Sequence, residues 1–159
     1  MVDGGFYRRR ANSLFGEKPP EARADELLDY CHRHIQKSRS TLYRIFYYDC
    51  QPSTKVIYHP LTSEQKNLGK SDEFEWMTAF LNEIVKKRKV ALRRGEELET
   101  QNGYMLKSKP LKKLCRGELS VEDLTEADFT LDITQKGVDM RMGLDIASMA
   151  ERGTCLLYT

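Results

Sequence analysis

The most constraining feature of the sequence is an almost continuous apolar and aromatic run, residues 42–48, followed by Asp49 and Pro52. A run with so little polar alternation is typical of a β-strand that is covered on both faces. Apolar residues at helical spacing predict amphipathic helices on either side of it, over about 24–38 and 71–88. We therefore expect an α/β domain in which helices cover a largely parallel sheet.

The second half of the chain predicts shorter elements. The runs 90–94 and 104–107 flank a polar stretch and indicate a β-hairpin or an irregular insert. A weak capping box predicts a short helix at 120–123. Apolar and polar residues alternate over 129–134, which predicts a strand with one apolar face, and a final helix is expected after Gly137, to about residue 151. A chain of 159 residues is long enough for one domain with its own core.

Several classes of protein are excluded by composition. With 40% hydrophobic and 31% charged residues and a net charge of +2, the chain is not wholly disordered. No stretch approaches the roughly 18 apolar residues of a membrane span, so no membrane partner is expected, and the first residues do not resemble a secretory signal. The cysteines are widely spaced, which predicts reduced thiols in a cytoplasmic protein rather than disulfides or a zinc site. They are Cys31, Cys50, Cys115 and Cys155.

Charge is segregated along the chain. Residues 86–116 contain eleven Lys or Arg against three Glu, a net charge of +8, whereas residues 117–151 contain nine acids against two basic residues, a net charge of −7. Such asymmetry is a known indicator of nucleic-acid contact, although two solvated surfaces of opposite charge explain it equally well. Trp76 has helical spacing to Phe74 and Phe80 and is predicted to belong to the core.

Aspartates follow the predicted strands. Asp3 follows a short first strand, Asp49 follows the run 42–48, and Asp139 follows the strand at 129–134. Because parallel strands end at one edge of a sheet, where ligands bind in α/β folds, these side chains are candidates for a common site. Simpler roles remain open: a helix N-cap for Asp139, a turn for Asp3 or Asp49, and solvent exposure for Asp145.

Converging carboxylates require a cation. Two unit charges about 4 Å apart repel by about 4 kcal/mol at an effective dielectric of about 20, and a third charge adds to this. A hard divalent cation with oxygen ligands, Mg²⁺ or Mn²⁺, relieves the repulsion without raising any carboxyl pKa. Such a metal beside a basic segment suits the hydrolysis of phosphodiester bonds.

Four segments of the chain resemble the NYN domain family, the LabA-like branch of PIN-like nucleases. They are the Val-Asp-Gly-Gly-Phe of residues 2–6, the Tyr-Tyr-Asp of 47–49, residues 91–96 and, most specifically, the K-G-V-D-x-x-x-x-x-D stretch of 136–145. The resemblance covers most of the chain and implies a Rossmann-like, PIN-type, three-layer α/β fold. It also implies a metal-dependent ribonuclease.

The resemblance assigns roles by position. It implies that Asp3, Asp139 and Asp145 are the catalytic residues and hold the Mg²⁺ or Mn²⁺ ion, with Asp49 as a peripheral member. The residues that would bind RNA are Lys136, Arg141, Arg93 and Arg94.

Two departures from the family pattern limit these expectations. The first motif of the family is often D-G-x-N, whereas the fourth position here is Phe6, and the family's S-G-D-x-D-F motif is absent. We therefore expect residues 1–159 to form a single NYN/PIN-like domain that is incomplete at both ends and lacks the C-terminal acidic strand–helix portion. The alternative functions are a non-catalytic RNA-binding or protein-interaction module that retains the fold, or a regulatory domain whose acidic cleft binds a partner.

Overall fold

The computed structural model describes residues 1–37, 39, 41–96, 99–134 and 137–153. Its main sheet has three parallel strands in the order β1 (Val2–Asp3), β2 (Ile45–Asp49) and β5 (Val90–Arg94). Asp3 lies beside Tyr48 and Asp49 lies beside Arg94, so the three strands end at one edge of the sheet. We call this the carboxyl edge.

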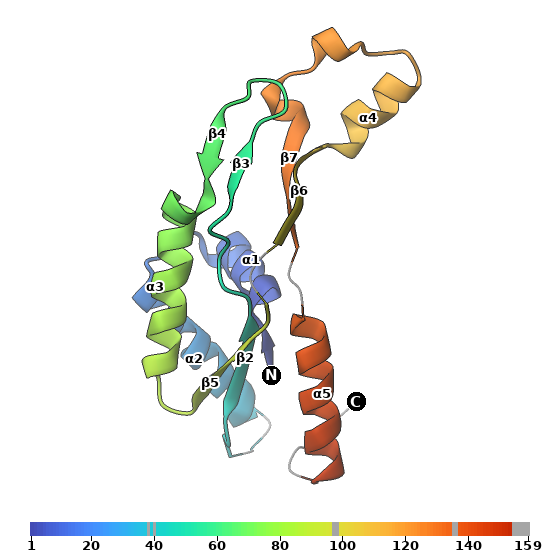
Figure 1. Ribbon diagram of the computed structural model, residues 1–159. Coiled ribbons are helices and arrows are strands. Elements are labelled where there is room, and N and C mark those ends of the chain that lie inside the picture. The colour runs from blue at the N-terminus through green and yellow to red at the C-terminus, as the bar shows by residue number, and fades with distance from the viewer. Residues whose placement is uncertain (38, 40, 97–98, 135–136, 154–159) are drawn as a thin grey trace.

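Helices cover both faces of β2. Tyr47 belongs to a core cluster with residues of α2 (Pro20–Lys37) and α3 (Asp72–Lys86), and it makes an edge-to-face ring contact with Tyr7 of α1 (Gly4–Phe15). Phe46 and Tyr48 point to the opposite face and pack against α5 (Val138–Glu151), which runs alongside the sheet in Figure 1. The α/β class with a small parallel sheet is therefore confirmed, and the PIN-type three-layer fold stays a prediction.

The alternation of side chains along β2 explains why its sequence is so apolar. All five residues of this strand are buried, because successive side chains enter the two different core clusters. The strand begins later than expected, since Tyr43 is 74% exposed and only Ile45 starts the sheet. The predicted doubly covered strand is otherwise confirmed.

The predicted hairpin between residues 90–94 and 104–107 is wrong. The first run is β5 of the main sheet, whereas β6 (Glu99–Leu106) pairs antiparallel with β7 (Phe129–Thr134) in a separate ribbon. β7 is therefore not a strand of the parallel sheet, contrary to the prediction from the sequence. One reason is that the residues of this ribbon have their own aromatic partner: His59 makes ring contacts with Tyr104 and Phe129.

The ribbon forms an arm that extends away from the main sheet (Figure 1). A second two-stranded ribbon, β3 (Val56–Tyr58) with β4 (Gln65–Asn67), lies beside it. The chain between β6 and β7 contains α4 (Ser108–Cys115) and a 3₁₀ turn at Val121–Asp123, whose capping box the sequence predicted. Short 3₁₀ turns at Leu68–Lys70 and Glu126–Asp128 complete the elements.

A buried arginine joins α1 to α2. Arg23 is fully buried, and its guanidinium donates to Glu26 at 2.6 Å, to Asn12 at 2.7 Å and to the carbonyl of Gly16. Burial raises the pKa of Glu26, but the hydrogen bonds from Lys18 and Arg23 outweigh burial and hold this pKa below its usual range. None of the helices in the described part of the chain is both long and apolar enough to cross a membrane.

Candidate functional site

The structure brings two of the predicted carboxylates and the start of a helix to the carboxyl edge. Asp3 ends β1 and Asp49 ends β2. Val138, the first residue of α5, packs in one cluster with Cys50, which directly follows β2. Because Asp139 is the next residue, it also lies at this edge. Asp3 and Asp49 therefore lie at this edge as expected, whereas Asp139 lies in the first turn of a neighbouring helix and does not follow a strand of this sheet.

Asp3 has the simpler of its two possible roles. Its Oδ1 accepts a hydrogen bond of 2.8 Å from the backbone N–H of Phe6, so that its side chain caps the N-terminus of α1. Capping satisfies one of the N–H groups that a helix leaves without an intrahelical partner, and it directs the carboxylate toward α1. Asp3 is half-buried, so it keeps contact with solvent at the edge.

Asp49 is a buried ion-pair partner rather than a turn residue. Its side chain is fully buried, it forms a salt bridge with Arg8 of α1, and its Oδ1 accepts a hydrogen bond of 2.9 Å from the N–H of Cys50. Gly4 makes this pair possible, because a Cβ there would lie 2.7 Å from the Tyr47 hydroxyl and closer still to the Asp49 carboxylate. The guanidinium of Arg8 thus supplies the cation that the argument from charge repulsion required.

Asp145 has partners on the sheet. Its Oδ2 accepts a hydrogen bond of 2.9 Å from the Tyr48 hydroxyl and lies 3.1 Å from Nε of Arg93. Burial, the hydrogen bond to Asp145 and the charge of Asp145 together raise the pKa of Tyr48, so this hydroxyl stays protonated and donates. Arg93 also lies over the ring of Phe46, with 5.3 Å between the guanidinium carbon and the ring centroid. This network joins α5 to β2 and β5.

The predicted RNA-binding residues therefore divide into two kinds. Arg93 is held by Asp145 and Phe46, although 42% of its side chain is exposed. Arg94 and Arg141 are exposed, and neither forms an ion pair with the residues that the structure describes. Lys136 lies outside the described residues.

The three predicted metal ligands do not form one group in this structure. Among the residues described, no set of three His, Cys, Asp or Glu side chains is placed to hold a metal ion. The reason is topological, because Asp3 caps α1, which packs against Tyr47 on one face, whereas Asp139 and Asp145 belong to α5 on the other face. The residues present do not fit a three-carboxylate metal site, and the Mg²⁺ or Mn²⁺ ion stays a prediction.

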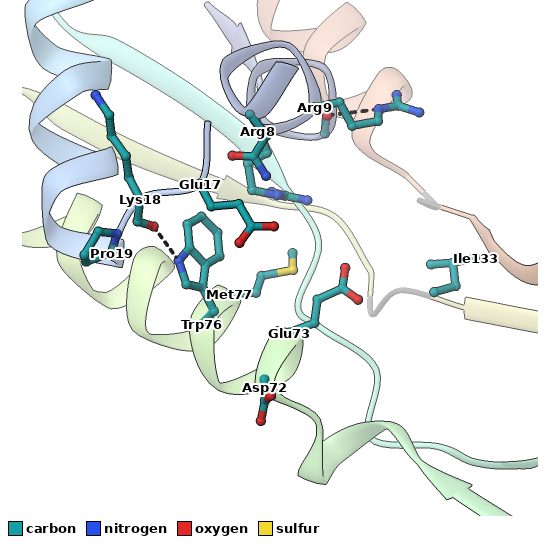
Figure 2. Close-up of a pocket in the computed structure, with 12 residues that line it drawn as sticks. Arg8, Arg9, Glu17, Lys18, Pro19, Asp72, Glu73, Trp76, Met77 and Ile133 are labelled. Carbon is teal, nitrogen blue, oxygen red and sulfur yellow. Dashed lines mark hydrogen bonds between the residues drawn. The ribbon is translucent and has the colours of Figure 1, made fainter. Parts of the chain in front are cut away.

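Sequence reasoning missed a cavity of about 970 Å³ on the α1 side of the carboxyl edge (Figure 2). It lies between α1, the turn that connects α1 to α2, and the first turns of α3. Trp76 lines this cavity while also stacking on Phe80 of the core, so the prediction of a core tryptophan describes only one side of its ring. The sequence signal was the basic run at 8–10, which follows the end of the first strand after four intervening residues.

The comparisons with known proteins add no identification. No protein-family model, no curated protein and no solved structure matches this chain. The resemblance to NYN domains therefore stays a prediction that rests on the sequence motifs.

Proposed function

We propose that this chain is a PIN-like α/β domain that binds single-stranded RNA at the carboxyl edge of its sheet. The observation that carries the proposal is the pair of exposed arginines at that edge. Arg94 ends β5, and Arg141 lies in the first turn of α5, beside the end of β2. Neither guanidinium is neutralised by a described carboxylate. The side-chain amide oxygen of Gln51 accepts a hydrogen bond of 2.6 Å from Arg94, but this neutral partner leaves the charge of Arg94 for a phosphate.

The chemistry of arginine supports this role. A guanidinium presents a planar fork of N–H donors that matches two phosphate oxygens, and it keeps its charge at every physiological pH. Two such forks on one edge, one from a strand end and one from a helix start, contact successive phosphates of an extended strand. The internal pairing of Arg8 and Arg93 keeps the neighbouring carboxylates Asp49 and Asp145 from repelling that strand.

The arm offers a second cationic surface. The segment around α4 carries five exposed basic side chains, of which Arg116 pairs with Glu118. α4 lies far along the arm from the main sheet (Figure 1). A strand of RNA that reaches from the carboxyl edge to α4 gains further phosphate contacts. The five are Lys107, Lys109, Lys112, Lys113 and Arg116.

Fluorescence anisotropy with a labelled single-stranded RNA, measured over a range of salt concentrations, tests the proposal. The double variant R94A/R141A is expected to bind at least about tenfold more weakly and to lower the magnitude of the salt slope by about 1.4, because each lost phosphate contact contributes about 0.7. The control is Arg33→Ala, which removes a cation of α2 that lines a different part of the surface and bonds only the carbonyl of Asp29 among described residues. Equal affinities of R94A/R141A and R33A contradict the proposal.

A second candidate function is metal-dependent hydrolysis of the bound RNA, which the family resemblance implies. The observation that favours it is that Asp139 is exposed in the first turn of α5, on the same helix turn as Arg141 and at the same edge as Asp3. Because the described carboxylates form no three-ligand group, we derive no catalytic step from them.

Cleavage of the same labelled RNA separates the two candidates. If the chain is a nuclease, Mg²⁺ or Mn²⁺ stimulates cleavage, EDTA abolishes it, and Asp139→Asn removes it while Glu151→Gln, at the far end of α5, does not. If the chain only binds RNA, the anisotropy signal persists and no cleavage occurs with either ion.

A further inference from the structure

The cavity of Figure 2 combines an aromatic face with charged groups of both signs. It opens at the carboxyl edge, because α1 starts directly after β1 and the first turn of α3 also lines it. Its volume of about 970 Å³ is at the upper end of the range for small-ligand sites, so a nucleotide fits within it.

The indole ring of Trp76 is held in one orientation. Its Nε1 donates to the carbonyl of Lys18 at 2.9 Å, and Phe80 stacks on one face with 5.2 Å between ring centroids and an interplanar angle of 12°. Phe80 covers one face of the ring only, and Trp76 also lines the cavity. A rigid indole face is a surface on which any nucleobase stacks favourably.

Two carboxylates extend into the space beside this ring. Figure 2 shows the side chain of Glu17, from the turn after α1, reaching toward the space between Trp76 and Met77, and that of Glu73, from the first turn of α3, beyond Met77. Neither carboxylate forms an ion pair with a described residue. Their oxygens can accept hydrogen bonds from a nucleobase that stacks on the indole.

Guanidinium groups lie on the α1 side of the cavity. Arg8 lines the cavity, and Arg9, which also lines it, donates its Nε to the carbonyl of Gly5 at 3.2 Å (Figure 2). Arg8 is shared with Asp49, but a guanidinium has five N–H donors and one carboxylate does not use all of them. The lining of the cavity thus contains carboxylate acceptors, guanidinium donors and a flat aromatic surface.

We propose that this cavity binds a guanine base of the RNA strand, an inference that rests on the proposed RNA-binding function and names its base preference. The Watson–Crick edge of guanine carries two adjacent N–H donors, which a carboxylate accepts, and its O6 and N7 accept from a guanidinium. Adenine places an acceptor nitrogen where guanine has a donor, so a carboxylate repels it. Pyrimidines stack less extensively on the indole. Guanine therefore matches all three groups of the lining.

The experiment uses the only tryptophan of the chain as its reporter. Two labelled RNAs are compared, an oligouridylate and the same strand with one central guanosine, by anisotropy and by quenching of Trp76 fluorescence. We expect the guanosine strand to bind about tenfold more tightly than the oligouridylate, because one base gains stacking and hydrogen bonds. We also expect it to quench the fluorescence of Trp76. A strand with one central adenosine is expected to bind like the oligouridylate.

The variant E17Q/E73Q tests the carboxylates directly. Both side chains are exposed, so the fold is retained, and the preference for guanosine is expected to fall to less than about twofold while binding of oligouridylate does not weaken. The control is Glu75→Gln, an exposed glutamate of the same helix that does not line the cavity and whose change leaves the preference intact.

The outcomes distinguish this inference from the proposed function. If both strands bind equally, or if E17Q/E73Q keeps the full guanosine preference, the guanine site is refuted while RNA binding stands. If neither strand binds, both proposals are overturned.

Discussion

Replacing Arg8 by leucine is expected to destabilise the fold by about 3–5 kcal/mol. The variant removes the guanidinium that neutralises the Asp49 carboxylate, which is fully buried beneath Gly4 and cannot reach water without opening α1. In a domain of this size each kcal/mol lowers the melting temperature by about 2–4 °C, so we expect a decrease of about 6–20 °C. Urea unfolding followed by circular dichroism measures the free energy of unfolding directly.

A double-mutant cycle isolates the interaction between Arg8 and Asp49. Asp49→Asn keeps the acceptor for the N–H of Cys50 but removes the negative charge. The double variant R8L/D49N therefore leaves no unpaired charge from this pair in the interior. We expect the double variant to be more stable than the sum of the two single changes by about 2 kcal/mol or more. Additive single changes, or a loss of less than about 1 kcal/mol in R8L, refute the claim that an internal arginine takes the place of a cation at this edge.

Three further predictions concern the same scaffold. Gly4→Ala is expected to destabilise the protein by about 1–3 kcal/mol in urea unfolding, because the added Cβ overlaps the Tyr47 hydroxyl and the Asp49 carboxylate; a neutral effect contradicts the close packing of α1 on β2. Tyr48→Phe removes the hydroxyl that donates to Asp145, and the loss of a hydrogen bond to a charged group is expected to cost about 1.5–3 kcal/mol by the same measurement. Because the pKa of Glu26 is lowered on folding, its contribution to stability is present above its ordinary pKa and is lost as the pH falls through the folded value. The difference in unfolding free energy between wild type and Glu26→Gln is therefore expected to shrink between about pH 6 and pH 3, and a constant difference speaks against the pairing of Glu26 with Lys18 and Arg23.

The main layers of the fold were predictable because their signals are local. The apolar run of β2 and the helical spacing of α3 and α5 depend only on neighbouring residues, and all three elements form, although β2 begins three residues later than the run that predicted it. α1 gave no such signal, since its few apolar residues are interspersed with three consecutive arginines and it is anchored by Asp3 and Arg8 instead. α2 begins at Pro20, a residue that suits the first turn of a helix, four residues before the start that the apolar spacing predicts.

The strand pairing was not predictable from local patterns. Residues 90–94 and 129–134 both have strand character, but neither segment contains a local signal that identifies the strand with which it pairs. The outcome depends on contacts distant in sequence: the pairing of β5 with β2, and the packing of His59 against Tyr104 and Phe129. The separation of Asp3 from Asp139 follows from the same cause, because it is set by the faces that α1 and α5 cover.

The alternation of side chains along a strand explains which charged groups at the carboxyl edge remain exposed to solvent. Side chains alternate between faces, so Arg93, beside Tyr48, points toward α5 and meets Asp145, whereas the next residue, Arg94, lies beside Asp49 and remains exposed at the strand end. The two adjacent arginines therefore have different roles, although the sequence alone predicts that both bind RNA. One consequence separates the two roles experimentally. Arg93→Ala is expected to lower stability, because it removes a charged partner of Asp145. Among the described residues, Arg94→Ala removes only hydrogen bonds to the neutral amide of Gln51, so it is expected to weaken RNA binding with a smaller loss of unfolding free energy. The opposite pattern, stability lost in R94A and RNA affinity lost only in R93A, means that the alternation does not decide which arginine faces the ligand.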